Sequence, residues 1–455
     1  MRKTALAVTL ISVLLITLFL VASVPILRAV SEAPQQQWSK NYLGTGGYAI
    51  QTYDGGYAIA GMNASMLFYP ASERAPILVK TDSSGGVQWR KTFEDVGVAG
   101  INSVVQTKDG GFALSGSNIA PPIMSPVYSG WLIKTDDQGN VQWRKTFGPL
   151  QSCHVIQASD SGYVLVGTIS NNVSSVDAVF VKTDPYGNIL WDKTQTFSGD
   201  SSHVFPMDVV ETDDGSYAVT GVWKDDFWLM KTDSNGNLLW NKTYDPVSTN
   251  NFLSFQSVST TKDGGYILAG MQSGGVTLQN GTLVSQDGNF AWLVKADSQG
   301  NAQWSQKYLS SIMGFTSAVQ TSDGGYVAVG AYNRQAWLVR TDASGNLFYN
   351  VSYGDKAENE SSHASTVVLT SDGGFAVSGA LNAYSPTSAE GFKITPFVGN
   401  DVWLAKFAPE SGSSPVDTSP DNVFQSVPVV VASVSAVTVV SAVLLVYFKK
   451  RKRQA

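Results

Sequence analysis

The chain has 455 residues, of which 43% are hydrophobic and 15% charged, and its formal net charge at pH 7 is −6. Eight of the 30 lysines and arginines lie in the two terminal segments, which leaves 22 against 36 aspartates and glutamates in between, a net charge of −14. A surface this acidic excludes nucleic acid as a partner, because phosphate recognition requires a basic face. The one cysteine, Cys153, excludes an internal disulfide framework.

The N-terminus carries the pattern of an export signal. Arg2 and Lys3 precede an uncharged apolar run over 4–27, and small residues follow before position 32. This pattern predicts a signal peptide over 1–31. The run is also long enough to stay in the membrane as an uncleaved signal anchor.

A unit of about 50 residues then repeats along the chain. Its first phrase reads DGGY, DGGF, DSGY or DGSY and begins at seven aspartates spaced 49 to 60 residues apart, which are Asp54, Asp109, Asp160, Asp214, Asp263, Asp323 and Asp372. In the unit over 101–148, four extended stretches alternate with a DGG turn, a loop and a DQGN turn. Four short antiparallel strands per unit predict one blade of a β-propeller, and the Asp and Gly residues supply the tight turns.

A second phrase, TDxxGNxxW, closes each unit. Its aromatic position is occupied by Trp89, Trp143, Trp191, Trp240, Trp304 and Tyr349. The same placement in every unit favours packing in the wedge between neighbouring sheets, where a large ring buries much area. The alternative is a series of aromatic ligand sites.

The seventh unit is incomplete, and its missing strand stands at the other end of the chain. No Trp strand follows 402–412, whereas QWSKNYLG over 37–44 matches QWRKTFG over 142–148. We therefore expect an all-β, seven-bladed propeller over 35–408, in which the N-terminal strand completes the last blade and removes two exposed sheet edges.

The DxxGNxxW phrase resembles the outer-strand motif of quinoprotein-like, pyrroloquinoline-quinone-type propeller repeats, with one residue fewer between Asp and Gly. As a whole, the chain resembles uncharacterised cell-surface propellers of archaea and bacteria. The resemblance implies the fold. An enzyme of the quinone type would be expected to have more blades, a calcium-bound cofactor and often paired cysteines, so we expect no cofactor here.

The C-terminus has the pattern of a membrane anchor. A Ser/Pro-rich stalk over 409–426 leads to an uncharged run over 427–448, followed by a basic tail over 449–455. This order predicts a single transmembrane helix with the propeller outside and the tail cytoplasmic. Six sequons are candidate glycosylation sites: Asn63, Asn172, Asn241, Asn280, Asn350 and Asn359.

The strand order separates two faces of the predicted ring. The DGG and DxxGN turns lie on one face, which we call the plain face, and the long, divergent loops lie on the other, the variable face. Binding residues gather on such loops. Aromatic residues from blades 1, 2 and 7 are expected to form a ligand-binding wall there, unless they pack on one another: Phe68, Tyr69, Tyr128, Tyr384 and Phe392.

The residues suited to catalysis are few. His154 and Asp208 both stand six residues before a turn aspartate on adjacent blades, so they could meet near the channel mouth as an acid–base pair or a simple hydrogen bond. A metal cluster would require His154, His203 and His363 to converge. Cys153 is expected to be a buried, inert thiol rather than a nucleophile. One Asp per DxxGN turn falls short of a calcium loop. We assign no catalytic residue and no metal ligand.

Together, these expectations describe a membrane-anchored surface propeller that acts as a binding, adhesion or scaffold module. Its expected partner is an extracellular protein or glycan. Two alternatives stay open: a propeller enzyme, either a quinoprotein-like dehydrogenase or a glycan hydrolase or lyase, and a purely architectural envelope protein.

Overall fold

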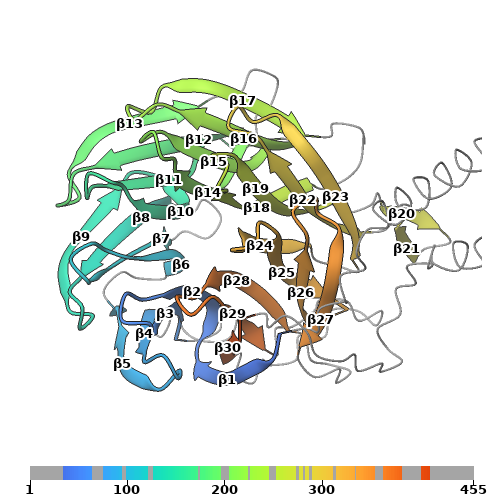
Figure 1. Ribbon diagram of the computed structural model, residues 1–455. Helices are drawn as coiled ribbons and strands as arrows, with labels where there is room; N and C mark the ends of the chain where they lie inside the picture. The colour runs from blue at the N-terminus through green and yellow to red at the C-terminus, as the bar shows by residue number, and fades with distance from the viewer. Residues whose placement is uncertain are drawn as a thin grey trace, which may run out of the picture. The chain divides into compact units, whose positions relative to one another are not determined.

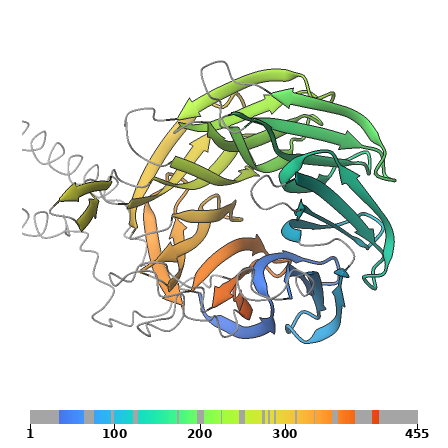
Figure 2. The ribbon, with the colours of Figure 1, turned by 180° about the vertical axis from the view of Figure 1, so that it is seen from behind.

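The chain folds into a ring of seven antiparallel sheets. The computed structural model describes residues 34–63, 75–94, 99–120, 127–172, 175–195, 204–223, 226–244, 253–272, 276–279, 282–285, 289–310, 314–333, 335–353, 362–381 and 401–409, all within the first of two units into which the chain divides, Met1–Ser413. Seven four-stranded sheets surround a central axis (Figures 1 and 2). The seven-bladed, all-β propeller is therefore confirmed.

Blades 1 to 3 each run from the innermost to the outermost strand in chain order. Blade 1 contains β2 (Thr45–Gln51), β3 (Tyr57–Met62), β4 (Pro76–Thr81) and β5 (Val87–Thr92). Blade 2 contains β6 (Ala99–Gln106), β7 (Phe112–Ala120), β8 (Val127–Thr135) and β9 (Val141–Phe147). Blade 3 contains β10 (Leu150–Gln157), β11 (Tyr163–Asn172), β12 (Ser175–Thr183) and β13 (Ile189–Gln195).

Blades 4 to 6 follow the same order, with one insertion. Blade 4 contains β14 (Val204–Glu211), β15 (Tyr217–Trp223), β16 (Asp226–Thr232) and β17 (Leu238–Tyr244). Blade 5 contains β18 (Leu253–Thr260), β19 (Tyr266–Gln272), β22 (Asn289–Ala296) and β23 (Ala302–Ser310), and its long loop carries a separate hairpin of β20 (Val276–Gln279) and β21 (Thr282–Ser285). Blade 6 contains β24 (Phe315–Gln320), β25 (Tyr326–Tyr332), β26 (Gln335–Thr341) and β27 (Leu347–Tyr353).

Blade 7 combines the two ends of the propeller. It contains β28 (His363–Leu369), β29 (Phe375–Leu381), β30 (Asp401–Phe407) and, as its outermost strand, β1 (Gln36–Leu43). Strand β1 pairs antiparallel with β30, with Trp38 opposite Lys406 and Tyr42 opposite Val402, and Figure 1 shows the blue β1 beside the orange-red β30. The predicted closure by the N-terminal strand is confirmed.

An ion pair fixes the first turn of every blade. In blade 2, Asp109 accepts hydrogen bonds from the Gly111 N–H (3.1 Å) and the Thr107 hydroxyl (2.5 Å), and its carboxylate lies 2.8 Å from the Lys134 amine. The same pair recurs at 2.7–2.9 Å in all seven blades, as Asp54–Lys80, Asp109–Lys134, Asp160–Lys182, Asp214–Lys231, Asp263–Lys295, Asp323–Arg340 and Asp372–Lys406. The turn aspartate and the lysine of the third strand therefore recur together for a structural reason.

The core lies between blades, and it explains the repeated Trp and Gly. Trp191 of blade 3 contacts Tyr217 of blade 4 (ring centroids 6.4 Å apart), and five other seams show the same contact at 5.4–6.2 Å. The same indole lies against Gly236 in the DxxGN turn of blade 4, where an added Cβ would be 2.6 Å from the ring. Gly236 also has a φ of +75°. The indoles are thus packing residues, as predicted.

Within the described ranges, no helix has the length and apolar character needed to cross a bilayer. The predicted signal, stalk, membrane span and basic tail lie outside the described residues.

Candidate functional site

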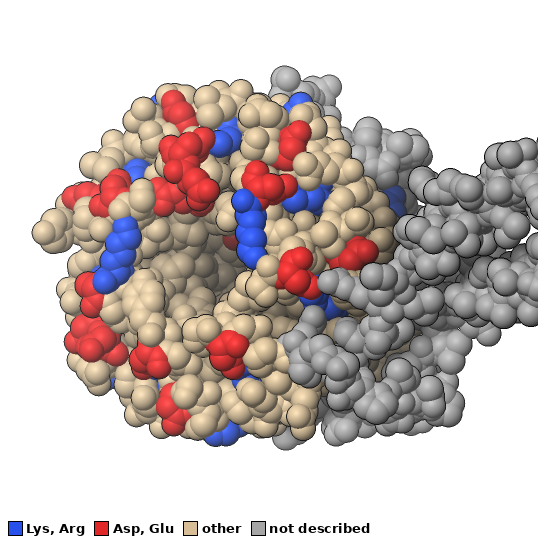
Figure 3. Space-filling view, in the orientation of Figure 1, with Lys and Arg blue, Asp and Glu red and all other residues tan. Residues whose placement is uncertain are grey.

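The seven innermost strands place one polar residue each at the same height. Counting six residues back from each turn aspartate gives Tyr48, Ser103, His154, Asp208, Ser257, Ser317 and Thr366, a set that we call the inner ring. These strands surround the axis, and the space-filling view shows a hollow at the centre of the molecule with acidic and basic side chains around it (Figure 3). Every member of the inner ring has a side chain that can form hydrogen bonds. Other positions on the same strands hold buried apolar residues.

A β-bulge precedes every member of the inner ring. The register of each innermost strand shifts just before this position, for example between Pro206 and Asp208 in β14 and between Gln151 and His154 in β10. Bulges redirect side chains and are frequent beside functional sites. In β10 the bulge includes Ser152 at a φ of +49°. The sequence analysis did not anticipate these bulges.

Small members of the inner ring hold neighbouring blades together. Ser103 donates to the Val155 carbonyl of blade 3 (3.2 Å). The Ser257 and Ser317 hydroxyls accept from the Ala318 and Val367 N–H groups of the next blades, both at 3.3 Å. These serines therefore have a structural role. Blades 1, 3 and 4 instead carry the large titratable side chains Tyr48, His154 and Asp208.

Asp208 is held by backbone N–H groups from two blades. Its Oδ1 accepts from Val209 of its own strand (2.9 Å), and its Oδ2 accepts from Val258 of blade 5 (3.0 Å). Burial raises the pKa of the carboxyl to about 7, although both N–H groups pull the pKa down. Near neutral pH this carboxyl is present in both protonation states.

Tyr48 lies on blade 1, three blades from Asp208. Burial raises the pKa of the phenol, and the Asp208 charge raises it further. The two side chains are therefore within electrostatic reach, although β2 and β14 belong to blades three apart. The sequence analysis missed Tyr48, yet the count of six residues that singled out His154 and Asp208 also identifies Tyr48.

His154 does not pair with Asp208. No hydrogen bond or ion pair joins the two side chains in the described part of the chain, and the Asp208 carboxylate instead accepts hydrogen bonds from backbone N–H groups. Burial lowers the pKa of the partly buried His154 to about 4, so the imidazole is neutral at physiological pH. Tyr48, His154 and Asp208 thus lie on the inner ring as separate groups.

The other predicted residues lie apart from this ring or outside the described part. Cys153 is fully buried, and burial raises the pKa of its thiol, which makes it inert. His363 begins β28, and burial lowers its pKa. Tyr128 lies on β8 opposite Ile119. No group of three His, Cys, Asp or Glu residues able to hold a metal occurs in the described ranges. Outside them lie His203, Phe68, Tyr69, Tyr384 and Phe392.

The sequons differ in their surroundings. Asn241 is exposed on β17. Asn63 accepts a bond from the Ala75 N–H (2.8 Å), and Asn350 accepts one from the Trp337 indole (3.3 Å). Asn172 ends β11, whereas Asn280 and Asn359 lie outside the described residues.

The carboxylates of the DxxGN turns are saturated by their own turns. Asp136 Oδ1 accepts from the Gln138 and Asn140 N–H groups (2.9 and 2.8 Å), and its Oδ2 accepts from the Asn140 side chain (2.9 Å). The repeated Asp and Asn therefore close the turn on themselves.

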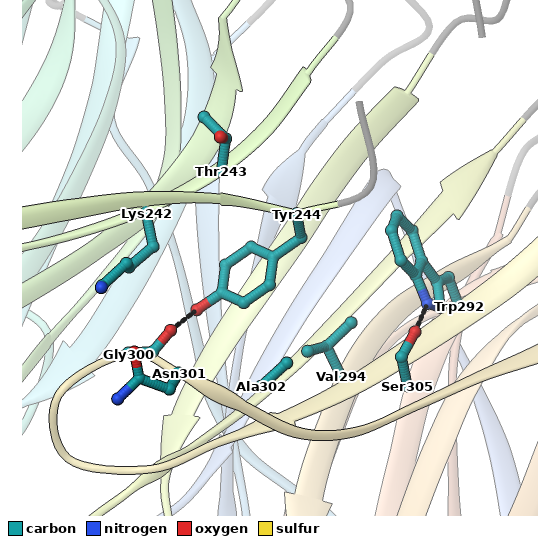
Figure 4. Close-up of a pocket in the computed structure, with 9 residues that line it drawn as sticks. All are labelled: Lys242, Thr243, Tyr244, Trp292, Val294, Gly300, Asn301, Ala302 and Ser305. Atoms are coloured by element: carbon teal, nitrogen blue, oxygen red, sulfur yellow. Dashed lines mark hydrogen bonds between the residues drawn. The ribbon is translucent and has the colours of Figure 1, made fainter. Parts of the chain in front are cut away.

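A cavity of about 530 Å³ opens between the outer strands of blades 4 and 5 (Figure 4). The Tyr244 hydroxyl donates across it to the Gly300 carbonyl (2.9 Å), and the Trp292 indole donates to the Ser305 hydroxyl (2.6 Å). Its main polar groups therefore bind one another, which makes it a weaker candidate site than the inner ring.

Comparisons with known proteins give no family for this chain. No protein family and no curated protein matches the chain. Solved structures that resemble it include the polysaccharide lyase Uly1 (11% identity, 84% of this chain and 95% of that one, TM-score 0.49). Others are the quinohemoprotein alcohol dehydrogenase of Comamonas testosteroni (11%, 87% and 79%, 0.46) and YCF48 bound to D1 peptide (12%, 85% and 99%, 0.45). The functions of these proteins vary, and similarity at this level assigns none of them to this chain.

Proposed function

We propose that the protein is a membrane-anchored surface propeller that binds an extracellular glycan at the channel end of its variable face. The observation that carries the proposal is that three inner-ring positions hold the large side chains of Tyr48, His154 and Asp208, where the other four positions hold Ser or Thr. A phenol, a neutral imidazole and a carboxyl supply the donors, acceptors and aromatic surface that sugar hydroxyls and ring faces require.

The rest of the scaffold supports this location. The repeated carboxylates of the plain face are engaged in their own turns and ion pairs, so they offer little to a ligand. The sequence predicts that the divergent loops lie on the variable face. The apolar pattern of the two terminal segments supports a propeller outside the cell with a cytoplasmic tail, and the exposed sequon at Asn241 is compatible with the same location.

A glycan array probed with the full-length chain in lipid nanodiscs tests the proposal. We expect defined glycans to bind, and Tyr48→Phe and Asp208→Asn to weaken that binding at least tenfold. Thr366→Ser is the matched control, because it alters the same ring without removing its hydroxyl. Equal binding by the wild type and the three variants would show that the glycan binds somewhere other than the inner ring. Capture of a surface protein without any glycan signal would favour a protein partner.

Acid–base catalysis on the bound glycan is a second candidate function. It is favoured by one observation: Asp208, with a pKa of about 7, lies within electrostatic reach of the Tyr48 phenol. Depolymerisation of an array-positive glycan, measured by chromatography, would support it if Asp208→Asn abolished turnover while retaining some binding. An intact glycan after prolonged incubation would leave binding as the function.

A further inference from the structure

A side-chain amide clamps most seams between neighbouring blades on the plain face. In five of the seven seams, the residue three before the turn aspartate reaches back to the first turn of the preceding blade. In seam 1–2, the Gln106 carbonyl accepts from the Tyr53 N–H (2.7 Å), while its amide donates to the Gly110 carbonyl of its own turn (3.1 Å). One primary carboxamide thus satisfies a donor of one blade and an acceptor of the next.

The clamp recurs in four other seams. Gln157, Gln320 and Gln51 make both bonds in seams 2–3, 5–6 and 7–1, and Glu211 accepts the equivalent N–H in seam 3–4. The donor distances are 2.7–2.9 Å. The geometry of the two turns is therefore built around a carboxamide or carboxylate oxygen.

Seam 4–5 has the two turns but no clamp. The equivalent residue is Thr260, whose side chain ends too close to its own backbone to span the seam. Among the described residues, the Asp213 N–H and the Gly264 carbonyl, which stand where Tyr53 and Gly110 stand in seam 1–2, consequently have no hydrogen-bond partner. Both residues line a cavity of about 390 Å³, together with Thr260, Lys231 and Lys262.

Seam 6–7 also lacks the clamp, but the residue at the clamp position is larger. Leu369 stands at the clamp position there, with 42% of its surface exposed. A leucine side chain is one atom shorter than a glutamine side chain and has no polar atom, so it cannot bond the turns. Thr260 is shorter still, and a cavity lies beside it between the two turns of seam 4–5.

We propose that the cavity in seam 4–5 binds a primary carboxamide, the group that glutamine and asparagine carry. The ligand carbonyl accepts from the Asp213 N–H, and its amide donates to the Gly264 carbonyl, which restores the pattern of Gln106. The cavity exceeds the size of an amide alone. Its Asp213 carboxylate can pair with the α-ammonium of a free amino acid, whereas the Lys262 amine donates to the Ser322 and Thr321 carbonyls of blade 6 (2.7 and 3.4 Å).

Ligand-observed saturation-transfer NMR on the full-length chain in nanodiscs tests this proposal. The probes are L-glutamine, propionamide, the blocked tripeptide Gly-Gln-Gly and L-glutamate, each at millimolar concentration. We expect L-glutamine to bind and L-glutamate to bind more weakly, because a carboxylate has no N–H to donate to the Gly264 carbonyl. Binding of L-glutamine without the tripeptide identifies a free amino acid as the ligand, and tripeptide binding identifies a side chain of a partner.

Three substitutions separate recognition from stability. Thr260→Gln supplies the missing carboxamide from within the chain, so it should abolish binding and raise the melting temperature. Thr260→Leu copies seam 6–7 and should abolish binding without that gain, whereas Thr260→Ser keeps the space open and should retain binding. Unchanged L-glutamine binding in Thr260→Gln, equal binding of glutamine and glutamate, or no saturation transfer to the wild-type ligands would overturn the proposal.

Discussion

Trp38 of β1 packs edge-on against Tyr57 of blade 1, with ring centroids 5.6 Å apart and planes inclined by 75°. Strand β1 itself belongs to blade 7. The Tyr42 hydroxyl adds a bond to the Gly85 carbonyl of blade 1 (2.9 Å). One N-terminal strand therefore completes the last blade and also fills the wedge that joins this blade to the first.

Deleting Gln35 to Gly44 should consequently destabilise the whole ring. The deletion exposes the edge of β30 and removes the indole from the seam between blades 7 and 1. Truncation of a fully buried Trp typically costs about 3–5 kcal/mol; Trp38 is partly buried, but the deletion also removes all the ladder hydrogen bonds between β1 and β30. Thermal unfolding followed by circular dichroism measures the effect, with a chain truncated before residue 34 as the control. Equal melting temperatures would contradict closure by β1.

Replacing turn glycines should separate backbone strain from packing. Gly215 and Gly236 both have a φ of +75°, but an added Cβ meets nothing within 4 Å at Gly215 and lies 2.6 Å from the Trp191 ring at Gly236. Gly215→Ala should cost about 1–2 kcal/mol for the left-handed backbone alone. Gly236→Ala should cost clearly more in urea denaturation. If the two variants were equally stable, the indole would not restrict this turn.

Replacing Leu by Gln beside one buried lysine, and Gln by Leu beside another, should change the stability of the protein in opposite directions. Lys134 donates to the Gln142 side chain (3.0 Å) as well as to Asp109, whereas blade 3 has Leu190 at the equivalent position, 60% exposed. Leu190→Gln should stabilise the protein, since a hydrogen bond to a charged group contributes about 1.5–3 kcal/mol. Gln142→Leu should destabilise it by a similar amount. Urea midpoints of both variants check the pair, and a change of the same sign in both would refute the argument.

The stability of the propeller should depend on Asp208 between pH 4 and pH 7. The folded pKa of about 7 lies above the ordinary value of 3.8. The stabilisation from the neutral carboxyl is therefore fully present below about pH 4 and is lost as the pH rises through about 7. The unfolding free energy of the wild type should fall relative to that of Asp208→Asn over this window. A difference between the two proteins that stays constant with pH would show that Asp208 has an ordinary pKa. Both proteins contain His154, whose own contribution to the unfolding free energy is lost as the pH falls towards about 4. The difference between the two proteins therefore does not include the His154 contribution.

The sequence alone determined the architecture, because the propeller is built from local signals repeated seven times. Each Asp-Gly turn specifies a hairpin from residues close together in the chain. The position of Trp38 four residues before Tyr42 matches that of Trp143 before Phe147, so the origin of the last strand could also be read from the sequence. The indoles could be assigned to packing on their periodic placement alone.

The tertiary structure decided which residues meet across the ring and between blades. Tyr48 and Asp208 are 160 residues apart in the sequence and come within electrostatic reach only because blades 1 and 4 curve around one axis. Their shifted pKa values arise from burial, which no local pattern encodes. The consequence of Thr260 likewise depends on the turn of the preceding blade. Contacts between distant segments depend on how the sheets pack, whereas turns and strands depend on neighbouring residues, and this difference separates the predictable fold from the site that had to be observed.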